Sequence, residues 1–76
     1  MELRWVSRGT VFADINGRTL RVSGEALVDR NPDFVIYPRY ITHWEDGTQL
    51  TDREKSEILA AVVAEAAKRG WKFEIE

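Results

Sequence analysis

Residues 10–23 read TVFADINGRTLRVS, and this stretch decides how the rest of the chain can be arranged. Apolar and polar residues alternate on both sides of Asn16-Gly17, which predicts two half-buried strands. Asn-Gly is the preferred pair for a two-residue type I′ turn, because both central positions of that turn need a positive φ. A two-residue turn also sets the register, so it places Val11 opposite Val22. The stretch therefore predicts an antiparallel hairpin.

The two faces of this predicted hairpin differ in chemistry. One face carries Val11, Ala13, Ile15, Leu20 and Val22, and the other carries Thr10, Phe12, Asp14, Thr19, Arg21 and Ser23. We expect the first face to contact the core, because a buried face fixes the register of a strand. On the second face Phe12 lies opposite Arg21, where an aromatic ring and a guanidinium can stack.

Further short strands are predicted on both sides of the hairpin. Leu3-Arg4-Trp5 alternates between apolar and polar side chains, so residues 2–7 favour an additional strand. Residues 34–37 are four consecutive apolar side chains, which indicates a central strand buried on both faces. Residues 40–44 alternate again and predict a partner strand. The connections at 24–33 and 45–48 are rich in turn-forming residues.

The clearest element is a helix in the C-terminal half. Thr51 and Glu54 have the spacing of a capping box, in which each side chain accepts a hydrogen bond from the other residue's backbone N–H. The apolar side chains that follow share one stripe at helical spacing: Ile58, Leu59, Val62, Val63 and Ala66. Gly70 takes the position after the last helical turn, where a positive φ is common. Residues 71–75 alternate and predict a final strand.

Together these elements predict an α+β fold in a single small domain over residues 1–76. We expect a mostly antiparallel sheet of about five to six strands with one long helix packed on one face, in the order β-β-β-β-β-α-β. Because the helix covers one face, the other face is left to water or to a partner. The strand near Trp5 or the C-terminal strand could be an edge, and an uncovered edge invites pairing, so homodimerisation stays open.

Length and composition exclude most classes of site. A chain of 76 residues builds a small core but not a deep pocket with a cofactor, so we expect no cofactor. The absence of cysteine excludes disulfides, a thiolate nucleophile and zinc sites built on sulfur, and a single histidine excludes a two-histidine metal site. No apolar run approaches the ~20 residues of a membrane helix, and the first residues lack the apolar stretch of a signal peptide. We expect a cytoplasmic protein without a membrane partner.

The charge balance gives no overall reason to bind nucleic acid. Eleven Lys or Arg residues against thirteen Asp or Glu residues leave a net charge of −2, with both signs mixed along the chain. A local stripe remains as the alternative function, because aromatic and arginine side chains on a sheet face can stack single-stranded bases. The residues of that alternative are Arg4, Trp5, Phe12, Arg18 and Arg21.

His43 is the candidate for acid–base catalysis, with Glu45 and Asp46 nearby as orienting carboxylates. Catalysis would also need a nucleophile or a positioned substrate, and no G-x-S-x-G motif is present in the sequence. We therefore expect a protein that is not an enzyme.

An aromatic cluster is the remaining functional signal. Five residues form it: Tyr37, Arg39, Tyr40, His43 and Trp44. Tyrosine, tryptophan and arginine are the residues that most often anchor protein interfaces. We predict that these five residues form a partner-binding site.

The order of several segments resembles a known group of proteins. The segments are Ser23-Gly24-Glu25-Ala26-Leu27, then Pro32-Asp33-Phe34-Val35-Ile36-Tyr37-Pro38, then Ile41 with Trp44, and finally an alanine-rich helix with Gly70 and a closing strand through Glu74. This arrangement resembles the small bacterial immunity proteins of polymorphic toxin systems, in the group catalogued as immunity protein seventy-four. The resemblance implies a non-enzymatic protein that binds and neutralises a cognate toxin made by the same cell. It supplies no catalytic residues and does not identify the toxin.

Overall fold

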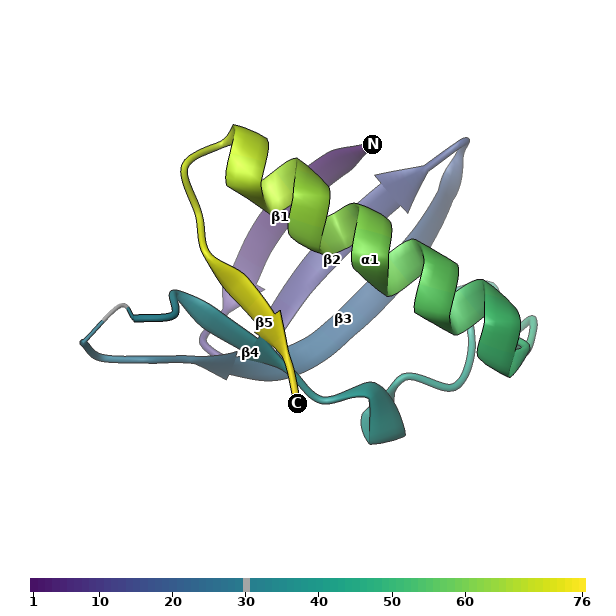
Figure 1. Ribbon diagram of the computed structural model, residues 1–76. Helices are drawn as coiled ribbons and strands as arrows, with labels where there is room; N and C mark the ends of the chain where they lie inside the picture. The colour runs from purple at the N-terminus through teal and green to yellow at the C-terminus, as the bar shows by residue number, and fades with distance from the viewer. Residues whose placement is uncertain (30) are drawn as a thin grey trace.

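The computed structural model describes residues 1–29 and 31–76, and its α+β architecture is the one that the sequence predicts. The elements of the described residues are β1 (Glu2–Ser7), β2 (Thr10–Ile15), β3 (Arg18–Ala26), β4 (Phe34–Ile36), the short 3₁₀ helix η1 (Pro38–Tyr40), α1 (Asp52–Lys68) and β5 (Phe73–Ile75). The strands form a five-stranded sheet in the order β1-β2-β3-β4-β5, and α1 lies across one face of it (Figure 1).

The sheet is mixed rather than wholly antiparallel. Strands β1 to β4 pair antiparallel with their neighbours, whereas β4 and β5 run parallel, with Phe34 opposite Phe73. A parallel pair needs a crossover connection, and here α1 returns the chain to the end of the sheet from which β5 starts. The predicted helix thus has two functions, since it covers the core and also sets the direction of the last strand.

The structure shows that the strand predicted over residues 40–44 is wrong, so four strands rather than five precede α1 in the described part of the chain. Pro38 begins η1, and the backbone N–H of Ile41 donates to the carbonyl oxygen of Pro38 at 3.0 Å. Proline has a fixed φ and no N–H, which suits the first turn of a helix better than the interior of a strand. His43 takes part in an isolated bridge outside the named strands. The alternating pattern belongs instead to a loop that turns Ile41 and Trp44 into the core.

The hairpin is confirmed in its turn and in its register. Asn16 and Gly17 have φ values of 50° and 80°, and Val11 pairs with Val22 as predicted. Four of the five apolar side chains on the predicted core face are fully buried: Val11, Ala13, Leu20 and Val22. Ile15, next to the turn, packs against this core while staying partly exposed.

The helix is also confirmed at both ends. The backbone N–H of Glu54 donates to Thr51 Oγ1 at 3.0 Å, and the backbone N–H of Thr51 donates to Glu54 Oε1 at 3.0 Å. Gly70 has a φ of 80° just beyond the helix. From the predicted apolar stripe, Leu59, Val62 and Ala66 are buried, and Ile58 and Val63 pack partly against the core.

A loop replaces a strand along half of β3. β4 pairs only with Gly24–Ala26, at the C-terminal end of β3. The N-terminal half of β3 therefore has another neighbour. That neighbour is the loop after η1, where the backbone N–H of Glu45 donates to the carbonyl oxygen of Thr19 at 3.0 Å. Ile41 and Trp44 on this loop are buried and complete the core at that edge.

The sheet curls until its two ends meet. Trp5 lies on β1, the first strand in the sheet order, yet its ring centroid is 5.5 Å from those of both Phe34 on β4 and Phe73 on β5. Beyond the end of α1, Arg69 forms an ion pair with Glu2 at 2.7 Å and thereby ties the helix to β1. The two ends of the sheet thus share one aromatic cluster.

Candidate functional site

Three neighbouring side chains form a compact surface feature, called here the η1 patch: Tyr37, Arg39 and Tyr40. The guanidinium carbon of Arg39 lies 5.2 Å from the ring centroid of Tyr37 and 4.8 Å from that of Tyr40. The two rings meet edge to face with centroids 6.1 Å apart. Tyr40 is 61% exposed although it takes part in these contacts. The patch therefore offers an ordered aromatic and cationic surface to solvent.

Hydrogen bonds and ion pairs from other elements fix the η1 patch. The hydroxyl of Tyr37 donates to Glu25 Oε1 on β3 at 2.9 Å, and Arg39 forms an ion pair with Glu76 after β5. The hydrogen bond to the Glu25 carboxylate raises the pKa of Tyr37 above its ordinary value, because it favours the protonated phenol. On the helix side, Lys55 Nζ donates to the carbonyl oxygen of Pro38 at 3.0 Å. Three separate elements thus hold the patch in one geometry.

The other two residues of the predicted cluster have different environments. His43 is exposed, and its Nδ1 lies 2.8 Å from Thr42 Oγ1. Trp44 is only 4% exposed, and the guanidinium carbon of Arg18 covers its ring at 4.1 Å from the centroid. The structure places the side chain of Trp44 in the core, apart from the exposed members of the cluster. It brings Tyr37, Arg39 and Tyr40 together, and the partner-binding role of the cluster stays a prediction.

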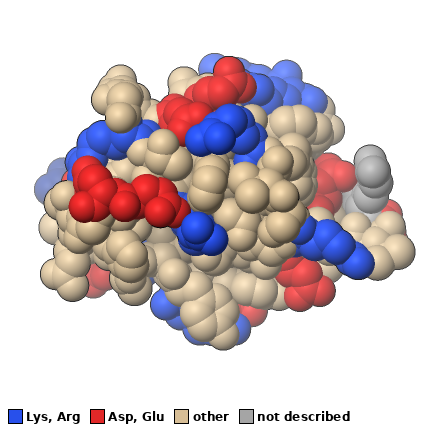
Figure 2. Space-filling view, turned by 180° about the vertical axis from the view of Figure 1, so that it is seen from behind, with Lys and Arg blue, Asp and Glu red and all other residues tan. Residues whose placement is uncertain are grey.

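The sheet face opposite α1 carries a network of paired charges. Arg4 donates to both carboxylate oxygens of Asp14, at 2.7 and 3.0 Å, and Thr19 Oγ1 donates to the same carboxylate at 2.8 Å. These hydrogen bonds, first from Arg4 and then from Thr19, hold the pKa of Asp14 below its ordinary value. Figure 2 shows this face of the molecule, with basic and acidic side chains side by side.

Phe12 lies between two arginines on this face. The guanidinium carbons of Arg4 and Arg21 are each 5.3 Å from its ring centroid. Arg21 also forms an ion pair with Glu45 at 2.9 Å, so the carboxylates of Asp14 and Glu45 neutralise both arginines. The stacking of Phe12 against Arg21 is confirmed, and the chain's own side chains occupy much of the face that the sequence leaves open.

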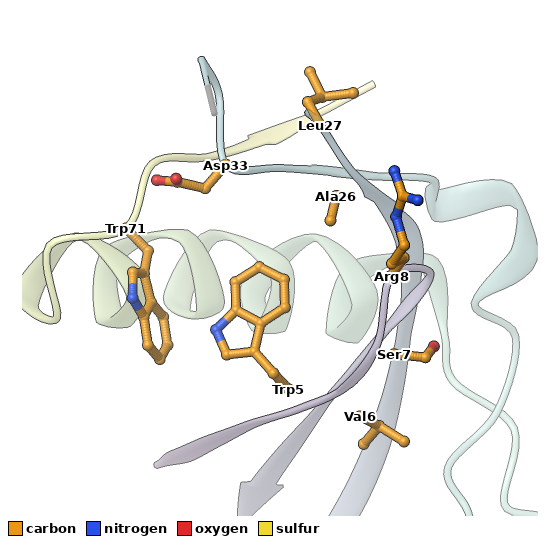
Figure 3. A pocket seen from close by; sticks show the side chains of 8 residues that line it. All are labelled: Trp5, Val6, Ser7, Arg8, Ala26, Leu27, Asp33 and Trp71. Carbon is orange, nitrogen blue, oxygen red and sulfur yellow. The ribbon is translucent and has the colours of Figure 1, made fainter. Parts of the chain in front are cut away.

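Sequence reasoning missed an open cavity of about 520 Å³ at the place where the two ends of the sheet meet. This feature, called here the seam cleft, is lined by Trp5, Val6, Ser7, Arg8, Ala26, Leu27, Asp33 and Trp71 (Figure 3). The rings of Trp5 and Trp71 lie edge to face with centroids 5.6 Å apart. These two residues come from opposite ends of the chain, and no spacing rule relates them. The one available signal is their type, because exposed tryptophan is common where proteins bind partners.

A comparison with protein families places this geometry in context. The family described as Immunity protein 74 matches residues 5–76, which is essentially the whole chain. The chain belongs to the immunity protein 74 family. The resemblance noted in the sequence is thereby confirmed, and membership suggests a role in neutralising a toxin. Searches of curated proteins and of solved structures gave no match.

The matched range of the immunity protein 74 family includes both surface features, the η1 patch and the seam cleft. The residues of the alternative nucleic-acid surface are divided, since Phe12 and Arg21 lie on one face while Trp5 packs on the helix side against Phe34. Carboxylates already pair with Arg4, Arg18 and Arg21. In residues 1–29 and 31–76, no helix combines the length and apolar character needed to cross a membrane.

Proposed function

We propose that this member of the immunity protein 74 family neutralises a cognate bacterial toxin by binding it directly, without catalysis. In this proposal the toxin belongs to a polymorphic toxin system, and both partners meet in the cytoplasm of the cell that makes them. The contact surface consists of the η1 patch and His43. The single observation that carries this assignment is the geometry of Arg39, which is held between Tyr37 and Tyr40 while Tyr40 remains 61% exposed.

The η1 patch has the physical properties of an interface anchor. Tyrosine and arginine are enriched among the residues that carry most of the binding energy in protein complexes. A side chain that is already ordered in the free protein loses little conformational entropy on binding. The contacts of Tyr37 with Glu25 and of Arg39 with Glu76 supply this order in advance. A partner that covers Tyr40 would therefore gain contact area at low entropic cost.

The environment of His43 supports binding rather than catalysis. A histidine that acts as a general base is commonly oriented by a carboxylate. Here Nδ1 of His43 lies beside the hydroxyl of Thr42 at 2.8 Å, while the nearby Glu45 carboxylate pairs with Arg21. We assign His43 to the rim of the contact surface, where its exposed ring can contact the toxin.

The experiment is to co-express this protein with the toxin domain encoded by the adjacent gene and to purify the complex. Calorimetry then compares the wild type with Tyr40→Ala and Arg39→Ala, and each variant should bind about tenfold more weakly or worse. The matched control is Arg53→Ala on α1, because Arg53 is highly exposed and its ion pair is local, with Glu57 at 3.2 Å. This control should bind like the wild type.

Two results would count against the proposal in different ways. A folded wild-type protein that does not bind the toxin domain would refute toxin neutralisation by direct binding. Wild-type affinity in both Tyr40→Ala and Arg39→Ala would leave the function standing but move the contact surface elsewhere.

A further inference from the structure

We infer that the seam cleft is a second recognition site, which binds an extended acidic segment of a protein partner. In this segment an apolar side chain stands two positions before a carboxylate, so that both point to the same side of the extended chain. The apolar side chain lies against Trp5 and Trp71, and the carboxylate pairs with Arg8. The inference rests on the proposed function only in taking the partner to be the toxin.

The apolar half of the seam cleft is preformed. Edge-to-face contacts with Phe34 and Phe73, each at 5.5 Å between centroids, fix the ring of Trp5, yet Trp5 remains 40% exposed. Trp71 is likewise fixed, because its ring stacks on Phe73 with an interplanar angle of 13°. Figure 3 shows both indole rings at one side of the cleft, with Arg8 and Leu27 at the other. A volume of about 520 Å³ falls within the range of protein ligand pockets.

The charge of the seam cleft selects an acidic partner. Among the arginines of the described residues, those with a carboxylate partner are Arg4, Arg18, Arg21, Arg39, Arg53 and Arg69. In the same part of the chain, Arg8 is the arginine for which no ion pair is found. Its guanidinium is therefore free to form one with a bound carboxylate, which suits the fork geometry of arginine.

The backbone holds Arg8 at the rim of the cleft. The backbone N–H of Ala26 donates to the carbonyl oxygen of Arg8 at 2.6 Å, and the backbone N–H of Gly24 donates to that of Gly9 at 2.9 Å. The turn between β1 and β2 is thus anchored on β3, so the base of the Arg8 side chain has a defined position.

Asp33, the acidic residue that lines the seam cleft, does not cancel the preference for an acidic partner. Asp33 Oδ2 accepts a hydrogen bond from the backbone N–H of Lys72 at 2.7 Å, so its carboxylate already has a partner within the chain. A basic ligand would compete with that bond and would meet the positive charge of Arg8. Figure 3 shows Asp33 near Trp71 and away from Arg8, so a ligand carboxylate that pairs with Arg8 lies at the other side of the cleft from the Asp33 carboxylate.

An extended segment fits because β1 is an end strand. It stands first in the sheet order, and its residues Trp5, Val6 and Ser7 line the cleft. A peptide in extended conformation can run along such an edge while its side chains enter the adjacent cleft. In an extended segment, side chains two positions apart point the same way, so an apolar side chain and a carboxylate at such positions can reach the indole rings and Arg8 together.

The test is an NMR titration of the full chain with three blocked tripeptides: acetyl-Leu-Ala-Glu-amide, acetyl-Leu-Ala-Gln-amide and acetyl-Leu-Ala-Lys-amide. The three tryptophan indole N–H signals are the reporters. We expect saturable shifts of the Trp5 and Trp71 signals with the Glu peptide and a fixed signal for the buried Trp44. The Gln peptide should bind up to about fivefold more weakly, because it lacks one partly exposed ion pair.

A charge swap separates recognition by Arg8 from a merely structural effect. Arg8→Glu should weaken binding of the Glu peptide by about tenfold and should make the Lys peptide the preferred one. Arg8→Gln should abolish the difference between the peptides. Both variants change an exposed side chain, so the indole signals of the free protein should keep their wild-type dispersion.

Two results would overturn the inference: indole signals of Trp5 and Trp71 that do not respond to the Glu peptide, or affinities that do not depend on peptide charge and on residue 8. Because the peptides contain no part of a toxin, this titration decides the role of the cleft whether or not the toxin-binding assay succeeds. A failure of the proposed function would appear in that assay alone.

Discussion

A Cβ atom on Gly24 would lie 2.7 Å from Cε2 of Phe34, because the ring of Phe34 packs directly on the glycine backbone. The same Cβ would also collide with the carbonyl oxygen of Val35 on the paired strand β4. Phe34 is fully buried and belongs to the aromatic cluster that joins both ends of the sheet. Glycine inside a strand often marks such a close approach. The absence of a side chain at position 24 is therefore a packing requirement.

The first prediction concerns this contact. Gly24→Ala should lower the free energy of unfolding by about 2–3 kcal/mol, because the added methyl group overpacks a filled core. Urea denaturation followed by circular dichroism measures the change. The matched control is Gly9→Ala. Apart from the adjacent residues, the atom nearest to its new Cβ would be the carbonyl oxygen of Gly24, at 3.4 Å. This variant should lose less than about 1 kcal/mol of the free energy of unfolding. Equal stability of the two variants would show that the Phe34 ring and strand β4 move to make room for the methyl group.

The second prediction concerns the pH dependence of the open sheet face. The pKa of Asp14 is lowered in the folded protein, so the ion pair with Arg4 stabilises the fold above the ordinary pKa of the carboxyl group. This stabilisation is lost as the pH falls through the lowered pKa. Asp14→Asn should therefore unfold more easily than the wild type at pH 7 but not in strong acid. Denaturation curves at both pH values measure the difference.

An NMR titration of the Asp14 carboxyl group checks the cause. Arg4→Ala should bring the pKa of Asp14 back toward its ordinary value, since Arg4 makes the largest contribution to the shift. Arg53→Ala, on the exposed surface of α1, should leave the pKa of Asp14 unchanged. If the pKa of Asp14 in the Arg4→Ala variant stays as low as in the wild type, the hydrogen bond from Thr19 is its cause instead.

The hairpin and the helix are predictable from sequence because their signals are local. Asn16-Gly17 specifies the turn and the register, and Thr51 with Glu54 specifies the start of α1, each within a few residues. The parallel pairing of β4 with β5 depends on the path of the whole crossover, which no local pattern shows. The strand expected over residues 40–44 fails because an alternating pattern also suits a loop that buries every third residue.

The candidate site divides in the same way. Tyr37, Arg39 and Tyr40 lie within four positions, so their proximity follows from the sequence. The burial of Trp44 depends on Arg18, which is distant in sequence, and on the part of β3 that β4 leaves unpaired. The seam cleft depends on the curl of the complete sheet, so nothing near Trp5 in the sequence could reveal it.

The third prediction contrasts two members of the predicted cluster. Trp44→Ala should lower the free energy of unfolding by about 3–5 kcal/mol, because it removes a large buried side chain. Tyr40→Ala should cost less than about 1 kcal/mol, because its ring contacts Arg39 and Tyr37 at the surface. Thermal or chemical denaturation compares them. Similar losses in the two variants would contradict the division between core and surface drawn here.

The fourth prediction tests whether the η1 patch is anchored to β3. The hydrogen bond from Tyr37 to Glu25 raises the pKa of the phenol, so its stabilisation is complete at neutral pH and is lost as the pH rises through the raised pKa. The chain has two tyrosines, and a Tyr40→Phe background isolates Tyr37. In that background, Glu25→Gln should lower the pKa of Tyr37, as followed by the ultraviolet absorbance of tyrosinate.

The matched control for this titration is Glu57→Gln, on the exposed surface of α1 and paired with Arg53. It should leave the pKa of Tyr37 as it is. If Glu25→Gln also leaves that pKa unchanged, the Glu25 carboxylate does not hold the phenol in solution, and the patch lacks its anchor on β3. A patch without this anchor would lose part of the entropic advantage on which its assignment as a binding surface depends. The direction of this shift therefore tests the anchoring of Tyr37 on β3, which is one support of the proposed role.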